Sequence, residues 1–378
     1  MDFHEAVNIE DLRAIARRRL PRFVFDYVDG GAEDERTLAA NCEAFARIRF
    51  RPRTLVDVGR RNLAAPLLGA PSAMPAVVGP TGLNGLSWRD GDLELARAAT
   101  SAGLPFAMST VSMSLVEDIA REAPGRLWLQ AYVFSERRIT EAIMRRAHEA
   151  GFECLMLTSD FPVAGKRERD LRTGLLPQQR FTLRTRLDIL MHPRWIATVA
   201  THRPRFVNVE RELGPGRDAN AFVGHGMFDP SFCWDDVRRF RDLWPRKLLL
   251  KGVLRADDAE HALTAGCDGI VLSNHGGRQL DGAVSGIDAL PEVARTVGGR
   301  TTILVDGGVR RGSDIAKAVA LGAEGVLLGR APVYGLAAGG RAGVAHALAI
   351  LADEFDRTLA LTGCPDVASL TPDLVAQP

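Results

Sequence analysis

The chain has 378 residues, of which 46% are hydrophobic and 25% are charged, and its formal net charge at pH 7 is +1. This length and composition predict a globular protein with one large or two medium domains and a sizeable core. The near-neutral charge, without a long basic run carrying aromatic residues, excludes the usual pattern of a nucleic-acid-binding protein.

The five cysteines are an odd number, widely spaced, and include no Cys-x-x-Cys pair. This pattern predicts reduced thiols and no metal site. The first ten residues carry three acidic side chains and no apolar segment of a signal peptide, and no run of eighteen apolar residues follows. We therefore expect a cytoplasmic protein that is neither exported nor threaded through a membrane.

The chain begins with helical periodicity. Apolar residues recur at spacings of three and four over 8–20 and 33–45, and residues 23–31 join these two segments. We expect residues 1–65 to form a helical extension that precedes the main fold.

Short apolar runs then alternate with helical segments. Continuous apolar strands separated by helices are typical of a parallel sheet covered on both faces, and eight βα units over about 250 residues have the size of a closed barrel. The sequence predicts an α/β protein of one domain, 1–378, with a (β/α)8 TIM barrel over 66–360 and a long insertion, 165–232, after the fourth strand. The strands are expected at 76–78, 106–109, 127–131, 154–158, 248–251, 269–273, 302–306 and 325–329.

In such a barrel the active site lies where the strands end, and nearly every predicted strand is followed by a polar group. Any one of these groups could be a turn residue or a cap, whereas a full set at one edge indicates a site. The set comprises Pro80, Thr81 and Gly82; Ser109; Gln130 and Tyr132; Thr158 and Asp160; Lys251; Ser273, His275 and Arg278; Asp306, Gly307, Gly308 and Arg310; Gly329 and Arg330.

The last two strand ends have the features of a phosphate site. Glycines at 307 and 308 precede a helix expected near 312–314, and Arg310 and Arg330 can neutralise a dianion. The alternative is a pair of tight turns with surface arginines. No Gly-x-Gly-x-x-Gly follows a strand, which favours a mononucleotide over a nicotinamide dinucleotide.

Lys251 ends an apolar strand, so its ammonium is desolvated unless it faces an anion. It could stabilise negative charge on a reduced ring. The competing interpretation is the Schiff-base lysine of a lyase.

Several motifs resemble the flavin mononucleotide (FMN) dependent L-2-hydroxy-acid oxidase and dehydrogenase family, and the likeness covers nearly the whole chain. The motifs lie at 25–32, 130–132, 273–281, 306–310 and 328–330. Within the family, the mandelate dehydrogenase branch is most similar, through segments 30–35, 79–85, 192–195 and 242–245.

The resemblance implies that His275 takes a proton as the substrate Cα–H bond breaks, by hydride transfer or through a carbanion, and that Asp160 orients it. Arg278 and Tyr27 would bind the substrate carboxylate, and Tyr132 the hydroxyl.

The resemblance also implies that Arg167 adds positive potential near the substrate and that Lys251 stabilises the anionic reduced flavin. FMN would be bound by Pro80, Thr81, Gly82, Ser109, Gln130, Thr158, Lys251, Ser273, Asp306, Gly307, Gly308, Arg310, Gly329 and Arg330.

The electron acceptor follows from the same comparison. Oxidases of the family have alanine where this chain has Gly82, and often tryptophan where it has Val111. The resemblance therefore favours a dehydrogenase that passes electrons to a quinone-type acceptor. The alternatives are an oxygen-using oxidase or an L-lactate dehydrogenase of the family, a lyase that uses Lys251, and a barrel without catalysis that serves as a scaffold.

The insertion mixes apolar residues with arginines over 179–208. A cationic amphipathic segment can lie on an anionic membrane, where quinones are found, and the resemblance implies a membrane-binding segment here. A lid or a subunit contact is the alternative. We expect a homotetramer, peripheral on the inner face of the cell membrane. The apolar residues are Phe181, Leu183, Leu187, Ile189, Leu190, Met191, Trp195 and Ile196, and the arginines are Arg180, Arg184, Arg186, Arg194, Arg203 and Arg205.

Overall fold

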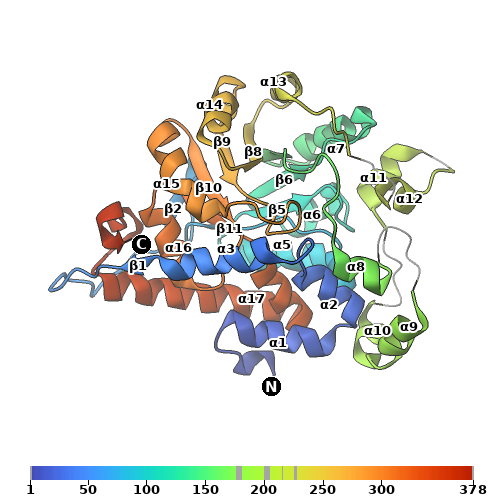
Figure 1. Ribbon diagram of the computed structural model, residues 1–378, viewed down its shortest axis with the longest axis horizontal. Helices are drawn as coiled ribbons and strands as arrows, with labels where there is room; N and C mark the ends of the chain where they lie inside the picture. The colour runs from blue at the N-terminus through green and yellow to red at the C-terminus, as the bar shows by residue number, and fades with distance from the viewer. Residues whose placement is uncertain (1, 176–180, 200–204, 215, 225–227, 377–378) are drawn as a thin grey trace.

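The computed structural model describes residues 2–175, 181–199, 205–214, 216–224 and 228–376. Its centre is a closed barrel of parallel strands, in which each strand pairs with the next in the chain and β11 returns to pair with β4 (Figure 1). The predicted (β/α)8 barrel is thereby confirmed. The barrel strands are β4 (Ala76–Val78), β5 (Phe106–Ser109), β6 (Leu127–Ala131), β7 (Cys154–Thr158), β8 (Lys247–Val253), β9 (Gly269–Leu272), β10 (Thr302–Asp306) and β11 (Gly325–Leu328).

The strand side chains alternate between the barrel interior and the surrounding helices. Val77, Trp128, Met156, Leu249 and Val271 belong to an apolar cluster inside the barrel that is distinct from the outer core. Both faces of each strand are buried, and this explains why the strand segments are continuous apolar runs in the sequence. The packed interior leaves the ends of the strands for chemistry.

A hairpin closes the end of the barrel at which the strands begin. Its strands, β2 (Ala65–Leu67) and β3 (Ala70–Ser72), pair antiparallel, and Leu67 and Leu68 join the interior cluster. A Cβ at Gly325, the first residue of β11, would lie 2.7 Å from Cδ2 of Leu67. The hairpin is therefore packed directly against the barrel, and the opposite end stays open.

Helices cover the outside of the barrel. Local residues set their ends, as at α15, where the Ser285 hydroxyl accepts a hydrogen bond of 3.1 Å from the backbone N–H of Asp288. The helices are α4 (Asn84–Ser87), α5 (Gly91–Ser101), α6 (Val116–Glu122), α7 (Arg137–Glu149), α13 (Trp234–Leu243), α14 (Ala256–Thr264), α15 (Gly286–Val297), α16 (Gly312–Ala320) and α17 (Arg330–Thr362).

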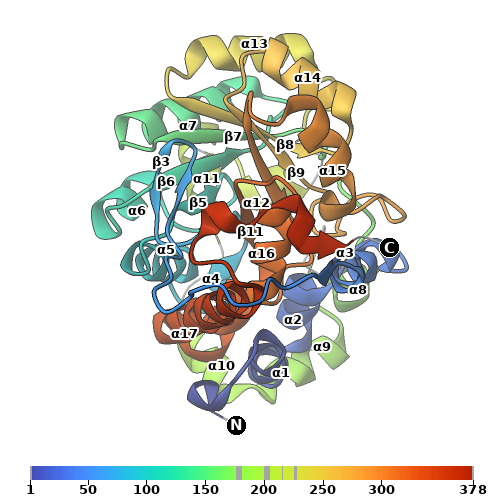
Figure 2. The same ribbon diagram turned by 90° about the vertical axis from the view of Figure 1, so that its left-hand side faces the viewer.

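The N-terminal extension is helical, as expected. The segments predicted at 8–20 and 33–45 correspond to α1 (Ile9–Arg19) and α3 (Arg36–Arg47), and α1 lies beside α17 beneath the barrel (Figure 2). Residues 23–31, expected only as a connection, fall largely within the helix α2 (Arg22–Asp29). The remaining terminal elements are η1 (Phe3–Glu5), β1 (Arg49–Phe50), η2 (Val367–Ser369), η3 (Pro372–Leu374) and β12 (Val375–Ala376).

Among the described residues, α17 is the one helix long and apolar enough to cross a membrane by length and composition. It packs against α1, α5 and α16, and its backbone leaves helical geometry at Gly339 and Gly340. The kink and these contacts are those of a core helix.

The insertion after β7 is a series of short helices at the side of the barrel (Figure 1). Trp195 anchors it by donating a hydrogen bond of 2.7 Å to the Leu86 carbonyl of α4. Of the residues singled out in this segment, Arg180 and Arg203 lie outside the described residues. The domain boundaries at 65, 165, 232 and 360 stay predictions. The helices are α8 (Glu168–Thr173), α9 (Leu183–Leu190), α10 (Pro193–Val199), α11 (Val207–Leu213) and α12 (Ala219–Gly224).

Candidate active site

A pocket opens where the barrel strands end, and about 1050 Å³ within it, counting space open to solvent, is free of protein atoms. A concave site with a few convergent polar groups is where cofactors and small substrates commonly bind. Asp160 and Ser273 lie behind its wall, hydrogen-bonded to His275 and Lys251. The other predicted site residues line the pocket: Tyr27, Pro80, Thr81, Gly82, Ser109, Gln130, Tyr132, Thr158, Arg167, Lys251, His275, Arg278, Asp306, Gly307, Gly308, Arg310, Gly329 and Arg330.

His275 follows β9 and lies between a carboxylate and a phenol. Its Nδ1 is 2.9 Å from Oδ1 of Asp160, and its Nε2 is 3.1 Å from the hydroxyl of Tyr132. Burial lowers the pKa of His275 although Asp160 acts to raise it, so the ring is neutral at pH 7. The two partners assign the proton to Nδ1, which donates to Asp160, and leave the Nε2 lone pair available. The ring can therefore accept a proton at Nε2.

The backbone around His275 aims its ring into the pocket. His275, Gly276 and Gly277 all have positive φ, at 59°, 66° and 74°, a conformation uncommon for a residue with a side chain. The Ser273 hydroxyl accepts a hydrogen bond of 3.0 Å from the His275 N–H. A Cβ at Gly277 would lie 2.6 Å from the backbone nitrogen of Leu38, so the turn requires glycine there.

Asp160 packs against a bulge in the neighbouring strand. The register of β8 shifts between Lys251 and Val253, and a Cβ at Gly252 would lie 2.6 Å from the Asp160 Cβ. Burial alone would raise the pKa of Asp160, but its interaction with His275 and the positive charge of Lys251 lower it. The carboxylate is therefore ionised and can stabilise a protonated His275.

Among the residues that the structure describes, four arginines line the pocket, and Arg278 and Arg167 are the two predicted to face the substrate. The guanidinium of Arg278 lies over the Tyr27 ring, 4.7 Å from its centre, and donates a hydrogen bond of 2.6 Å to the Tyr27 carbonyl. The guanidinium of Arg167 lies 5.6 Å from the centre of the Phe161 ring. Burial and the nearby charge of Arg278 lower the pKa of Arg167 to about 10, so it remains charged at pH 7. A carboxylate is the natural partner of such a pair.

Lys251 lies between Asp306 and Ser273, with its Nζ 2.8 Å from Oδ2 of Asp306 and 2.7 Å from the Ser273 hydroxyl. Burial alone would lower the pKa of Lys251, but Asp306 and Asp160 raise it. A protonated amine is not a nucleophile, so this arrangement disfavours the Schiff-base lyase.

Two glycines follow β10 where no side chain fits. Gly307 and Gly308 have φ of 85° and 89°, and a Cβ at Gly308 would lie 2.1 Å from the Asn41 carbonyl oxygen. Gly329 differs, because a Cβ built there would face open space at the start of α17. Arg330 donates to the carbonyls of Val28, Gly30 and Gly276, and Arg310 donates to the Val309 carbonyl. The loops predicted to bind phosphate thus line one side of the pocket.

The polar groups in the pocket suit FMN. The Ser109 hydroxyl donates to Oε1 of Gln130 at 2.8 Å, and the Gln130 amide donates to the Thr158 hydroxyl at 2.6 Å, which presents a row of polar atoms to a heterocycle edge. Oδ1 of Asp306 is buried and has no partner within the described part of the chain. This oxygen can accept a hydrogen bond from a hydroxyl of the sugar chain.

The sequence pattern described as FMN-dependent dehydrogenase matches residues 16–377. The chain belongs to the FMN-dependent dehydrogenase family. The (S)-mandelate dehydrogenase of Pseudomonas putida is 47% identical to it over 97% of this chain and 93% of that protein. An L-lactate dehydrogenase of Caulobacter vibrioides is 43% identical over 97% of each.

Solved structures agree with this assignment. A crystal structure described as the monotopic membrane protein (S)-mandelate dehydrogenase matches this FMN-dependent dehydrogenase with a TM-score of 0.93 at 45% identity, over 99% of this chain and 100% of that chain. A mandelate oxidase structure matches with a TM-score of 0.82 at 36% identity, over 98% of each chain. The cofactor of the family is FMN.

Sequence reasoning missed an aromatic cluster in this FMN-dependent dehydrogenase. The rings of Phe161 and His275 are 5.1 Å apart, as are those of Phe228 and Tyr132, and the two phenylalanines are 4.2 Å apart. Phe161 directly follows Asp160, and this adjacency could have identified it. Phe228 is distant from Phe161 in the sequence and lies near the site because it forms a β-bridge with Phe134. No pattern in the sequence predicts this bridge.

Proposed function

We propose that this enzyme oxidises an (S)-2-hydroxy acid, mandelate or a close analogue, to the 2-keto acid. The observation that carries the proposal is a neutral His275 held between Asp160 and Tyr132 in a pocket that Arg167 and Arg278 also line. A 2-hydroxy acid offers a carboxylate to the arginines, a hydroxyl to Tyr132 and a Cα–H bond to the base. Relatives named for mandelate and for L-lactate support the same substrate class.

In this proposal His275 accepts a proton at Nε2 while the substrate Cα–H bond breaks. Bound FMN would supply the acceptor for the two electrons and the second proton that leave the substrate as the keto group forms. Asp160 stabilises the imidazolium that forms, through the hydrogen bond of 2.9 Å to Nδ1. Burial raises the pKa of Tyr132, so its hydroxyl stays protonated and can donate to a substrate oxygen.

Arg278 is positioned to hold the substrate carboxylate. Its Nη1 already donates to the carbonyls of Tyr27 and Gly30. Among the described residues Nε and Nη2 have no hydrogen-bond partner, and this pair of donors forms a fork that matches a carboxylate. Tyr27 would donate a second bond, and Arg167 would add positive potential.

The cofactor-binding residues proposed here divide by chemistry. Asp306, Gly307, Gly308, Arg310, Gly329 and Arg330 would hold the sugar chain and the phosphate, and Pro80, Thr81, Gly82, Ser109, Gln130 and Thr158 the heterocycle. Lys251, held by Ser273, would supply positive charge to the heterocycle. The support is that these residues surround one pocket, with Ser273 behind its wall.

A substrate with an aryl group is supported by the relative named for mandelate and by Val111 in the pocket lining, because an apolar ring gains from burial against apolar surfaces. L-lactate is the second candidate. It has the same carboxylate and hydroxyl, and L-lactate dehydrogenases are among the relatives at 43% identity.

We propose a quinone-type electron acceptor rather than oxygen. The support is Gly82, where the resemblance associates alanine with oxidases. A Cβ at this position would lie 3.1 Å from Cγ2 of Val111 and 3.2 Å from the Tyr27 hydroxyl, so the glycine keeps space open in the pocket. An oxygen-using enzyme is the alternative.

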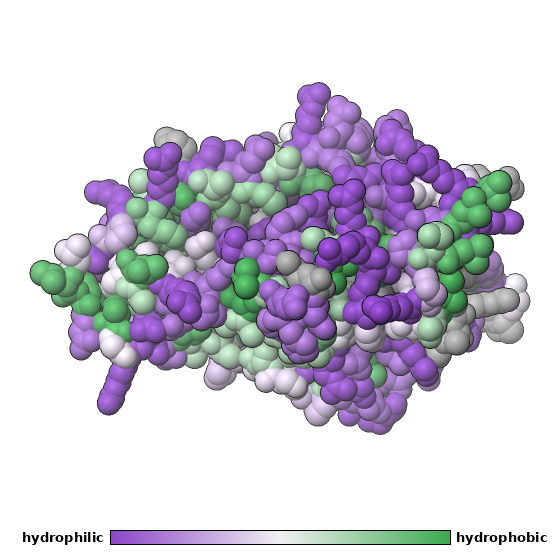
Figure 3. All heavy atoms as spheres, turned by 90° about the horizontal axis from the view of Figure 1, so that it is seen from below, coloured by the Kyte–Doolittle hydropathy of each residue, from purple (hydrophilic) through white to green (hydrophobic). Residues whose placement is uncertain are grey.

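A membrane-contact surface on α9 supports access to a quinone dissolved in lipid. Leu183, Leu187, Leu190 and Met191 have 74%, 55%, 68% and 79% of their surface exposed. Figure 3 shows hydrophobic side chains gathered at this end of a mostly hydrophilic face. A structural relative is described as a monotopic membrane protein. We propose that the enzyme binds peripherally to the inner face of the cell membrane, as a homotetramer.

Purified protein tests the proposed function through its absorption spectrum. The protein should be yellow, and (S)-mandelate added without oxygen should bleach the flavin absorbance. L-lactate and the (R)-acid serve as comparisons for side chain and handedness. A colourless protein, or a flavin that no 2-hydroxy acid bleaches, would contradict the proposal. Flotation with anionic vesicles and light scattering test the membrane contact and the tetramer.

A further inference from the structure

The turn that ends α2 holds two arginines of the pocket through one carbonyl group. The Gly30 oxygen accepts a hydrogen bond of 3.0 Å from Nη1 of Arg278 and one of 2.8 Å from Nη2 of Arg330. The Tyr27 carbonyl accepts a further bond of 2.6 Å from Nη1 of Arg278, and the Val28 carbonyl accepts one of 3.0 Å from Nε of Arg330. The place of this turn therefore sets the relative position of both guanidiniums.

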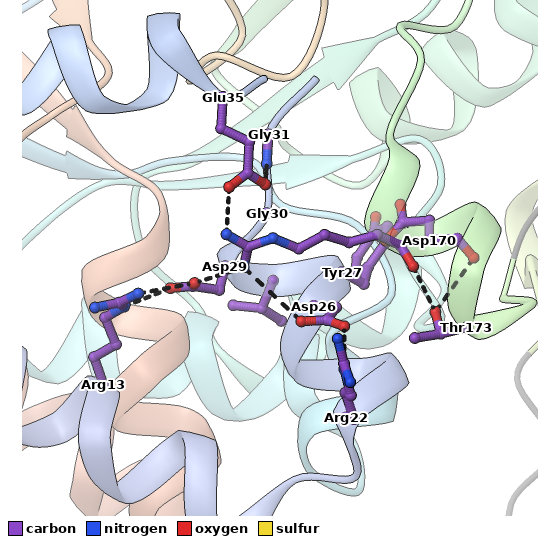
Figure 4. A network of polar contacts seen from close by, with 12 residues as sticks. Arg13, Arg22, Asp26, Tyr27, Asp29, Gly30, Gly31, Glu35, Asp170 and Thr173 are labelled. Atoms are coloured by element: carbon purple, nitrogen blue, oxygen red, sulfur yellow. Dashed lines mark hydrogen bonds and ion pairs between the residues drawn. The ribbon is translucent and has the colours of Figure 1, made fainter. Parts of the chain in front are cut away.

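The same turn is fastened from outside the pocket by Arg169 of α8. Nη1 of Arg169 lies 3.1 Å from Oδ2 of Asp29, and Nη2 pairs with Oε2 of Glu35. Oε1 of Glu35 in turn accepts a bond of 2.9 Å from the Gly31 N–H. Figure 4 shows Asp29 and Glu35 on either side of Gly30 and Gly31. Arg169 thus spans the turn by holding the residues that flank it.

Close packing leaves this turn little freedom. A Cβ at Gly30 would lie 2.5 Å from the Asp26 carbonyl oxygen and 3.2 Å from Cδ of Arg169. A Cβ at Gly31 would lie 2.8 Å from the Gly277 carbonyl oxygen, in the loop that carries His275. A displacement of the Arg169 side chain would therefore reach the backbone of the pocket directly.

Asp29 gives Arg169 a fixed anchor. It is 4% exposed and accepts hydrogen bonds of 2.5 Å from Nε of Arg13 and 2.7 Å from the Tyr334 hydroxyl. Burial alone would raise the pKa of Asp29, but the bonds from Arg13 and Tyr334 lower it to about 2. An ionised carboxylate with donors on both oxygens cannot follow a moving partner, so Arg169 is held at a defined place.

We infer that Arg169 is a positioning residue that sets Arg278 for the substrate carboxylate by locking the Gly30–Gly31 turn. This inference rests on the proposed function. The residue two positions earlier, Arg167, lines the pocket itself. The start of α8 therefore carries two arginines with different surroundings. Arg167 lines the pocket, and Arg169 contacts the turn that holds Arg278.

Arg169→Met tests the inference, because it keeps the length of the side chain and removes the ion pairs with Asp29 and Glu35, together with the longer one of 3.8 Å with Asp26. The measurement is the dissociation constant of phenylacetate, a carboxylate without the hydroxyl, titrated by the absorbance of the FMN-loaded enzyme. A displacement of about 1 Å can cost about 10²-fold, and we expect phenylacetate to bind at least about tenfold more weakly, with a matching rise in KM for mandelate. The pH dependence set by His275 should stay unchanged.

The matched control is Arg172→Met on the same helix. Arg172 is exposed and pairs only with Glu168 among the described residues, so its loss should leave phenylacetate affinity unchanged. Arg169→Lys should recover part of the affinity, because it restores the charge but not the double contact. An Arg169→Met enzyme that binds phenylacetate as tightly as the unmodified enzyme would overturn the inference, and so would an equal loss in the control.

Glu35→Gln provides a second variant should Arg169→Met fail to fold. It removes the charge facing Arg169 but keeps an oxygen for the Gly31 N–H, and a smaller loss of phenylacetate affinity is expected. Unchanged affinity in this variant would also overturn the inference. Bleaching of the unmodified enzyme by (S)-mandelate separates the two proposals. If bleaching occurs and the variants bind normally, only the inference fails, whereas an enzyme that neither bleaches nor binds phenylacetate overturns both.

Discussion

Replacing Asp160 by Asn should disable His275 by reversing its tautomer. The carboxylate now accepts from Nδ1–H, while its Oδ2 is buried without a partner among the described residues. An asparagine that kept its oxygen toward His275 would bury both amide N–H groups at the place of Oδ2, away from His275. The other orientation donates one N–H to Nδ1 and puts the carbonyl at the place of Oδ2, which is already a buried oxygen without a partner among the described residues. We therefore expect the proton to move to Nε2, which removes the lone pair from the pocket.

The size of the effect distinguishes the two orientations. Loss of one hydrogen bond to a charged group weakens stabilisation by about 1.5–3 kcal/mol, or roughly 10- to 150-fold in rate. A base held in the wrong tautomer loses about 10⁴-fold. The buried position of Asp160 favours the second outcome, so the rate of flavin reduction should fall by about 10⁴-fold with little change in phenylacetate affinity.

Stopped-flow reduction of the flavin by (S)-mandelate without oxygen measures this rate. Its pH dependence gives a second test. Burial lowers the pKa of His275, so reduction by the unmodified enzyme should decline only as pH falls below about 6.5, the ordinary value for histidine. In the Asp160→Asn enzyme, loss of the negative charge beside His275 lowers the pKa of His275 further, so the decline in rate moves to lower pH. A variant that reduces its flavin within tenfold of the normal rate would refute the role given to Asp160.

Other substitutions test the remaining roles. His275→Asn should keep the yellow flavin while the rate of reduction falls by more than the roughly 10²- to 10⁴-fold typical of one acid–base group, and an unchanged rate would remove His275 from the mechanism. Arg278→Lys keeps the charge but loses the fork, so KM should rise and kcat fall together, and normal steady-state kinetics would assign the carboxylate to another residue. Gly82→Ala places a methyl group 3.2 Å from the Tyr27 hydroxyl and should raise KM while increasing hydrogen peroxide formation. Full turnover of the unmodified enzyme with oxygen as sole acceptor would instead establish an oxidase.

The sequence predicted the barrel well because its signal is local. A strand buried on both faces must be apolar throughout, and seven of the predicted strands lie within one residue of the observed ends. The eighth, predicted at 248–251, extends over Lys247–Val253, because a bulge continues it past Lys251. The bulge depends on the close contact between Gly252 and Asp160. Neither segment alone contains a pattern that predicts it.

The sequence predicted which residues form the site but did not predict how they are arranged. Apolar runs ending in polar groups placed His275 and Lys251 at one edge of a barrel. The left-handed backbone of His275 and the turn carbonyls that hold Arg278 come from contacts between distant segments. The helix α2 was missed because its sequence, rich in aromatic and β-branched residues, is stabilised by packing rather than by intrinsic propensity.

The hairpin that plugs one end of the barrel has a consequence for directed evolution of this enzyme. Leu67 and Leu68 fix the core from the end remote from the pocket, so loops at the open end can vary without opening the barrel. Libraries at Val111, Phe161 and Phe228 should therefore yield many folded variants with altered substrate range. Libraries at the hairpin should yield mainly changes in heat resistance, with the choice of acid left as it is.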